Sequence, residues 1–72
     1  MTERRLGNRL KQARTQRGLT QAELATLAGV SRKTVNTIEN QVYVPSTALA
    51  LALAAALETT VEALFFLIEE PH

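Results

Sequence analysis

Apolar residues recur along much of this chain at three- and four-residue spacing, which is typical of helices that bury one face. In the first segment Leu6, Leu10 and Ala13 share one face, while arginine, lysine and glutamine fill the others. The pattern predicts a helix over residues 3–17. Gly18 then supplies a residue that commonly ends a helix.

Two capping signals predict a pair of short helices in the middle of the chain. The run Thr-Gln-Ala-Glu from Thr20 is a capping box, so a helix is expected over residues 20–28. Gly29 permits the left-handed turn that ends it. Ser31 is a preferred N-cap residue, and it opens a helix over residues 31–40. Apolar positions with the spacing to fill the wedge between the two helices are Leu24, Ala25, Ala28, Val30, Val35 and Ile38.

The second half of the chain predicts two further helices. A loop over residues 41–45 ends in proline, and Ser46 caps a helix over residues 47–57, which is too rich in alanine for a strand. A second capping box, Thr-Thr-Val-Glu from Thr59, opens a fifth helix over residues 59–69. No strand is expected, so the fold class is all-α with five helices. The predicted core is Leu6, Leu10, Leu24, Leu27, Val35, Ile38, Leu49, Leu53, Val61, Leu64 and Phe65.

Length and composition restrict the chain to a small set of protein classes. Its 72 residues predict a single domain over residues 1–72, and a chain this short is marginally stable alone. There is no cysteine, and the one histidine is His72, so neither a metal site nor a cofactor is expected. The longest uncharged apolar run is too short to span a bilayer and the amino end has no signal-peptide pattern, which favours a cytoplasmic location without membrane contact.

Charge is distributed unevenly along the chain. Residues 1–33 contain eight basic and two acidic residues, a net charge of +6, whereas residues 34–72 contain five acids and no base, a net charge of −5. This asymmetry indicates either one basic face that binds a polyanion or a solvated surface that is merely lopsided. The basic residues are Arg4, Arg5, Arg9, Lys11, Arg14, Arg17, Arg32 and Lys33.

The middle of the chain carries a specific motif. Residues 17–46 read RGLTQAELATLAGVSRKTVNTIENQVYVPS, and the text continues as ALALALAAALETTVEALF. This string resembles the phage repressor/Cro-like (XRE) helix-turn-helix regulators over nearly the whole chain. The resemblance implies that residues 20–40 form the helix-turn-helix, whose second helix enters the major groove of DNA.

The resemblance also implies roles for individual residues. Gln21, at the start of the first helix of the motif, is expected to bind a phosphate, with help from the helix N-terminus. Arg32 and Lys33 suit the O6 and N7 atoms of guanine, and Asn36 suits the N6 and N7 atoms of adenine. The expected DNA-binding set is Gln21, Ser31, Arg32, Lys33, Thr34, Asn36, Thr37, Asn40 and Tyr43. For Arg32 and Lys33 the alternative is ordinary solvated charge, and for Tyr43 it is a cover for the loop.

Two further features follow from the resemblance. Arg14 and Glu39 match an ion pair that ties the first helix to the end of the third in this family. Relatives often have glycine after the Glu-Asn pair, whereas this chain has Gln41. Either Gln41 takes a strained left-handed conformation there, or Asn40 takes it instead.

A dimerisation region is expected over residues 46–70. On a helical wheel of the fifth helix, Val61, Leu64, Phe65 and Ile68 share the face toward the core. Apolar residues that point elsewhere therefore imply a partner surface. The predicted interface is Leu51, Ala63, Phe66 and Leu67.

The leading hypothesis is a homodimeric transcriptional regulator, a repressor that binds a two-fold symmetric operator in double-stranded DNA. An antitoxin or controller protein with a protein partner remains an alternative, as does the first module of a larger ligand-responsive regulator. A protein-interaction module fits the charge asymmetry less well. An enzyme is least favoured, because the sequence offers no cysteine, no paired histidines and no placed carboxylate dyad. No small-molecule ligand is evident.

Overall fold

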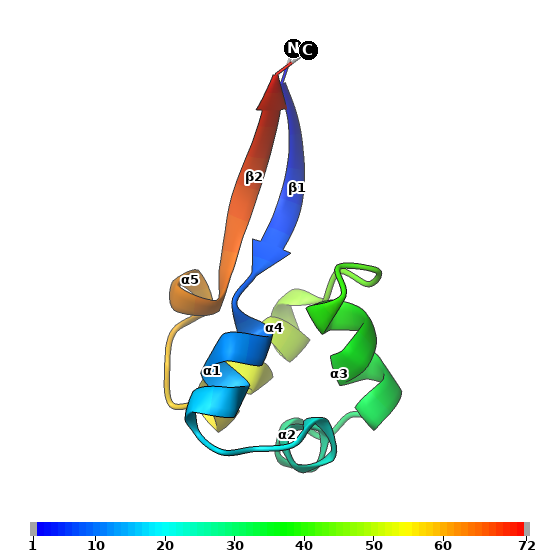
Figure 1. Cartoon of the computed structure of the whole chain (residues 1–72), viewed down its shortest axis with the longest axis vertical. Coiled ribbons are helices and arrows are strands. Elements are labelled where there is room, and N and C mark those ends of the chain that lie inside the picture. Colours follow the sequence, from blue (N-terminus) through cyan, green and yellow to red (C-terminus); the bar gives the residue numbers. More distant parts are fainter. Residues whose placement is uncertain (1, 72) are drawn as a thin grey trace.

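A body of helices carries a two-stranded ribbon in the computed structural model of the protein (Figure 1). The structure describes the backbone of residues 2–71 and the side chains of residues 5–69, so the side chain of Arg4 and the whole of His72 lie outside the described residues. The elements in order are β1 (Thr2–Asn8), α1 (Leu10–Gln16), α2 (Gln21–Ala28), α3 (Arg32–Glu39), α4 (Thr47–Ala56), α5 (Val61–Leu64) and β2 (Phe65–Pro71).

The helices α2 and α3 begin and end where their capping residues predict. The Thr20 hydroxyl accepts a hydrogen bond from the Glu23 N–H at 3.0 Å, and the Glu23 carboxylate accepts one from the Thr20 N–H at 2.9 Å. Gly29 then ends α2 at φ 75°, and Ser31 caps α3 by accepting from the Thr34 N–H. The capping box, the glycine turn and the cap of α3 are therefore confirmed.

The helix α4 is confirmed almost to the residue, but α5 differs from its prediction. Ser46 caps α4 by accepting from the Leu49 N–H. The N-cap of α5 is Thr60, which accepts from the Ala63 N–H, so the capping box predicted from Thr59 is wrong. The helix ends at Leu64, because the next residue already has an extended backbone at φ −123° and ψ 144°.

The predicted first and last helices are wrong at the two ends of the chain. Residues 2–8 and 65–71 form an antiparallel two-stranded sheet instead, so the all-α class holds only approximately. Gly7 and Asn8 are poor helix formers, whereas the Phe-Phe-Leu-Ile run in β2 has high strand propensity. The three-residue periodicity around Leu6 was misleading, because Leu6 packs on the core from a strand.

The ribbon is held by a contact that only glycine permits. Gly7 lies opposite Phe66, and a Cβ atom at Gly7 would come within 2.5 Å of the Phe66 ring. The Arg9 guanidinium covers the same ring, 4.3 Å from its centroid. Phe66 is therefore half-buried within its own chain rather than left open on a helix surface.

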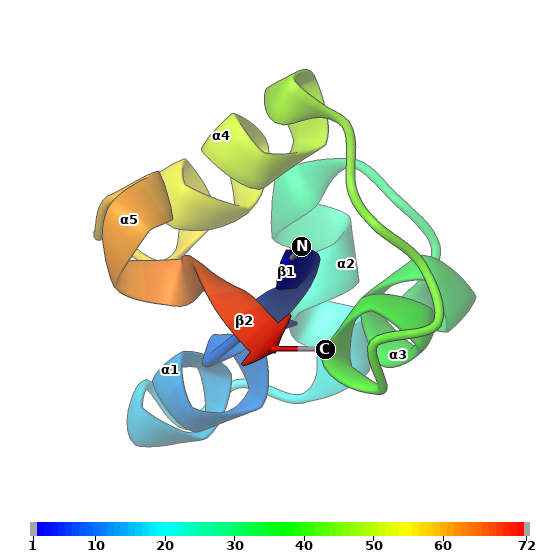
Figure 2. The same ribbon diagram turned by 90° about the horizontal axis from the view of Figure 1, so that it is seen from above.

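Two hydrogen bonds join the base of the ribbon to the helical body. The Asn8 side-chain amide donates to the Ile38 carbonyl in α3 at 2.9 Å. The Arg9 N–H donates to the Leu64 carbonyl at the end of α5 at 2.8 Å. Seen along the ribbon, the helices are arranged around its axis (Figure 2).

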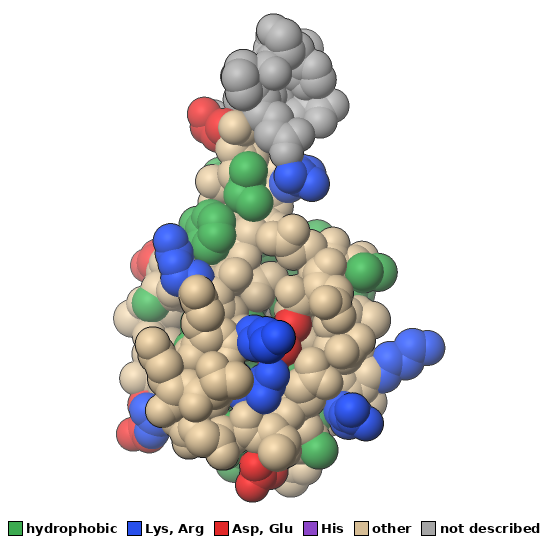
Figure 3. Space-filling model, viewed as in Figure 1, with side chains coloured by type: hydrophobic (Ala, Val, Ile, Leu, Met, Phe, Trp, Pro, Cys, Tyr) green, Lys and Arg blue, Asp and Glu red, His purple; other side chains and the backbone are tan. Residues whose placement is uncertain are grey.

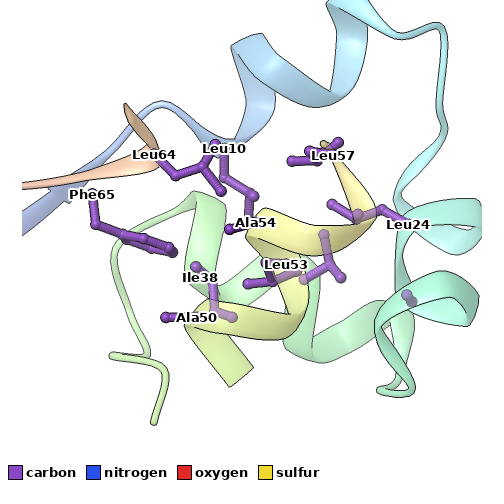
Figure 4. Packing of buried hydrophobic residues seen from close by; sticks show 11 residues of the cluster. Leu10, Leu24, Ile38, Ala50, Leu53, Ala54, Leu57, Leu64 and Phe65 are labelled. Carbon is purple, nitrogen blue, oxygen red and sulfur yellow. The ribbon is translucent and has the colours of Figure 1, made fainter. Parts of the chain in front are cut away.

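The core lies where the helices meet, below the ribbon (Figure 4). Leucines from α1, α2, α4 and α5 converge there on Val35 and Ile38 of α3. Leu27 is an exception to the predicted core, because its position on α2 leaves it 61% exposed. The buried set is Leu10, Leu24, Ala25, Val35, Ile38, Ala50, Leu53, Ala54, Leu57, Leu64 and Phe65.

The turn after α3 resolves the alternatives at the Glu-Asn pair. Gln41 has φ 61°, whereas Asn40 has φ −89° and acts as the C-cap of α3. Because a side chain is unfavourable in the left-handed region, this position carries local backbone strain.

Replacing Gln41 with glycine is expected to raise the free energy of unfolding by about 1 kcal/mol, because glycine has no Cβ atom to strain. Urea denaturation of the purified protein measures the change. The matched variant Gln41→Ala keeps the Cβ atom and should show no such gain. An equal effect of both variants would contradict the strain at this position.

Candidate nucleic-acid interface

Helices α2 and α3 place four of the predicted residues around one surface hollow. The hollow has a volume of about 470 Å³ and is lined by Gln21, Arg32, Lys33 and Asn36. Gln21 is the first residue of α2, and the other three lie on the first two turns of α3. Arg32, Lys33 and Asn36 are exposed and Gln21 is half-buried. The hollow therefore combines two cations with two amides, groups that hydrogen-bond phosphates and base edges.

A second hollow continues along α3 toward the loop that follows it. Its volume is about 310 Å³, and its lining consists of Lys33, Thr34, Thr37, Val42 and Tyr43. Tyr43 is 46% exposed, so it lies at the surface and is not part of the core. Lys33 borders both hollows, which joins them into one continuous strip.

Four of the predicted residues are already engaged in local hydrogen bonds within or beside α3. Ser31 and Thr34 share a hydroxyl contact of 2.9 Å at the cap of α3, and the Thr37 hydroxyl donates to the Thr34 carbonyl. The Asn40 amide donates to the Asn36 carbonyl at 2.9 Å. Ser31 and Asn40 line neither hollow, although each is hydrogen-bonded to a predicted residue that does, Ser31 to Thr34 and Asn40 to Asn36.

Side-chain amides connect α2 to α3 across the first hollow. The Gln21 Nε2 group donates to Glu39 Oε1 at 3.1 Å, and Asn36 Nδ2 donates to Gln21 Oε1 at 3.5 Å. Sequence reasoning missed the contact between Gln21 and Glu39. The two residues are 18 positions apart, and only the crossing of the two helices brings them within reach.

The ion pair implied for Arg14 and Glu39 is present. Arg14 Nε donates to Glu39 Oε2 at 2.7 Å, and a second guanidinium nitrogen donates to Oε1 at 3.2 Å. The remaining nitrogen donates to the Leu19 carbonyl at 2.8 Å. The hydrogen bond to Glu39 raises the pKa of Arg14, against the opposing effect of burial. Arg14 is thus a buried cation that ties α1 to the end of α3.

Lys and Arg side chains stand out around the helical body, including the side where α3 lies, whereas apolar side chains lie both on the ribbon and on the body (Figure 3). The exposed Arg17 is paired with Glu58, which leaves it less suited to an anionic partner. In the part of the chain that the structure describes, no helix is long and apolar enough to cross a membrane.

Comparison with known proteins places this geometry in context. Residues 10–64 match the profile of the family described as helix-turn-helix. The uncharacterized HTH-type transcriptional regulator YgzD of Bacillus subtilis is 41% identical over 63 residues, covering 88% of this chain and 96% of that protein. An uncharacterized HTH-type transcriptional regulator of Methanocaldococcus jannaschii is 41% identical over 58 residues, covering 81% of this chain and 88% of its own length.

One solved structure is similar in both fold and sequence. The restriction-modification controller protein C.AhdI from Aeromonas hydrophila aligns with a TM-score of 0.74 and 36% identity. The alignment covers 76% of this chain and 83% of that one.

Breaking the buried ion pair should be costly. Replacing Arg14 with methionine leaves the Glu39 carboxylate buried without its cation, and we expect a loss of about 3–5 kcal/mol in the free energy of unfolding. Urea denaturation measures the loss, and a collapse of the helical circular dichroism signal would report a loss larger than the whole stability.

Two further variants separate burial from charge. The double variant Arg14→Met with Glu39→Leu should recover part of the loss, because no unpaired charge remains. Arg17→Met removes the exposed partner of Glu58 and should lower the free energy of unfolding by less than about 1 kcal/mol. Equal losses for Arg14→Met and Arg17→Met would contradict the structural role of the buried pair.

Proposed function

The chain belongs to the helix-turn-helix family, of the phage repressor/Cro-like (XRE) type, and from this premise we propose that it represses transcription as a homodimer bound to a two-fold symmetric operator. That it is a DNA-binding transcriptional regulator follows from its family and its relatives. The proposal adds three claims to this: the regulator represses transcription, it is a homodimer, and its operator is two-fold symmetric.

The observation that carries the proposal is the strip of cations and amides along the start of α3. Arg32 and Lys33 lie in the first turn of that helix, where the helix dipole already disfavours positive charge. Two exposed cations in this position are compatible with an anionic partner. With Asn36 they supply the donors and acceptors that read base edges in the major groove.

The other residues of the proposed interface position the protein on the DNA backbone. Gln21 stands at the N-terminus of α2, where backbone N–H groups favour a phosphate. Tyr43, which is an exposed residue lining the second hollow, extends the strip beyond α3. The remaining residues of the proposed interface lie beside these groups on α3 or at its ends: Ser31, Thr34, Thr37 and Asn40. For Asn40, both amide N–H groups already donate to Asn36, so a phosphate contact would replace one of these hydrogen bonds.

The proposed dimer rests on apolar side chains that the chain itself leaves uncovered. Leu51 on α4 is 57% exposed and Leu67 on β2 is 59% exposed. Ala63 is also exposed, whereas Phe66 is half-buried beneath Arg9 and contributes less than its sequence position suggested. A two-fold dimer would place its two α3 helices about 34 Å apart, one turn of DNA.

A second candidate function is control of a neighbouring pair of genes. It is favoured by the likeness to C.AhdI, a restriction-modification controller protein. Both candidates use the same DNA chemistry. Mapping the bound sites on the genome of the source organism separates them, because a controller occupies the promoter of its own partner genes.

Selection from a random duplex pool at low salt tests the proposal. We expect the selected sequences to share a symmetric consensus. In a plot of the logarithm of affinity against the logarithm of salt concentration, each phosphate neutralised should contribute about −0.9 to the slope. Arg32→Ala should weaken binding to the consensus by about 1–3 kcal/mol of binding free energy, and should weaken binding to unrelated DNA much less. Lys11→Ala, an exposed cation on α1, is the matched control and should leave the preference unchanged. If no duplex is retained, or if Arg32→Ala weakens all sequences equally, the proposed base-reading role is wrong.

The dimer has its own test. Leu67→Glu should give a folded monomer that binds the operator far more weakly, because a charge is introduced into an apolar contact. Sedimentation velocity measures the mass in solution. Leu27→Glu changes a leucine of similar exposure on α2 and should leave the dimer intact. A monomeric unmutated protein at micromolar concentration would refute the dimer.

A further inference from the structure

A row of side-chain amides runs along the proposed DNA surface with a single direction of hydrogen bonding. Asn40 Nδ2 donates to Asn36 Oδ1 at 3.3 Å, and Asn36 Nδ2 donates to Gln21 Oε1 at 3.5 Å. Gln21 Nε2 then donates to Glu39 Oε1 at 3.1 Å. Each amide donates an N–H to the next member in the order Asn40, Asn36, Gln21 and Glu39, and the side-chain oxygens of Asn36 and Gln21 accept from the preceding member.

The direction of the row follows from the chemistry of its last member. An ionised carboxylate only accepts hydrogen bonds, so the group that faces Glu39 has to be the nitrogen of Gln21 and not its oxygen. The oxygen of Gln21 is thereby turned toward Asn36, where only the nitrogen of Asn36 can meet it. The same rule leaves the Asn36 oxygen facing Asn40. A single charge thus settles the orientation of Gln21 and Asn36, while the Asn40 amide is also oriented by its hydrogen bond to the Asn36 carbonyl.

Glu39 is itself held in place by the guanidinium group of Arg14. Its side chain is only 4% exposed, and both carboxylate oxygens accept from Arg14. Its carboxylate therefore faces a fixed, buried cation on one side and the Gln21 amide on the other.

We propose that Glu39 is a positioning residue for base recognition, which sets the edge that Asn36 presents in the major groove. This inference rests on the proposed function. In the orientation set by Glu39, Asn36 offers one remaining N–H and one remaining lone pair on its oxygen. An asparagine with this pattern pairs with N7 and N6 of adenine. A flipped amide would present the two groups in reverse, and it would lose both of its neighbours in the row.

Two variants remove the orientation in different ways. Glu39→Gln keeps the shape of the side chain but allows either end of its amide to face Gln21, so the direction of the row is no longer set. Gln21→Met cuts the row while leaving the ion pair between Arg14 and Glu39 intact, so it keeps the fold even if Glu39→Gln does not. Glu58→Gln is the matched control, because it neutralises the exposed carboxylate paired with Arg17.

The DNA measurement compares preference position by position. The base pair that Asn36 contacts is first identified as the one whose preference is lost in Asn36→Ala. Both row variants should lower the preference for adenine there by about tenfold, and the positions read by Arg32 should keep theirs. Glu58→Gln should change neither the adenine preference nor the preference at the positions read by Arg32. A uniform loss at all positions, or an unchanged adenine preference in both row variants, would overturn the proposal.

A measurement on the free protein distinguishes failure of this inference from failure of the proposed function. In nitrogen-15 spectra, the side-chain NH2 signals of Gln21 and Asn36 should both shift in Glu39→Gln. In Gln21→Met the NH2 signals of Asn36 should shift. In Glu58→Gln the NH2 signals of both residues should stay in place. This result stands whether or not an operator is found. Unmoved Gln21 signals in Glu39→Gln would show that the carboxylate does not orient the row, and the positioning role would fall.

Discussion

The buried pair of Arg14 and Glu39 is the interaction on which the arrangement of the helices depends. It joins α1 to the last residue of α3, and the third nitrogen of Arg14 also donates to the Leu19 carbonyl before α2. One guanidinium therefore connects α1, the end of α3 and the segment that leads into α2. A hydrophobic pair of the same volume would fill the space equally well, but it would not specify one relative position of the three segments.

The centre of the chain could be predicted from sequence because its signals are local. A capping box, a glycine turn and a serine cap each act over a few residues, so α2 and α3 follow from Thr20, Gly29 and Ser31 alone. The ion pair was implied by the family resemblance and not by these signals. The contact between Gln21 and Glu39 belongs to neither class. It depends on the crossing of two helices, which no short motif records.

The ends of the chain could not be predicted because the information that decides them is not local. Residues 2–8 and 65–71 satisfy their backbone hydrogen bonds with each other, and neither segment reveals its partner in its own pattern. Leu6 keeps the spacing of a helical face although it lies in a strand. The one local hint was Gly7, whose missing side chain leaves room for Phe66. Likewise, the exposure of Leu27 reflects how α2 is oriented, which its spacing alone does not determine.

The pairing of β1 with β2 has a consequence for the order in which the protein folds. The two strands are separated by almost the whole length of the chain, so their pairing closes the largest loop that the described residues allow. The contacts between α2 and α3 span a much shorter stretch and are expected to form early. β1, although it is the first segment in the chain, therefore has no partner until the last segment is in place.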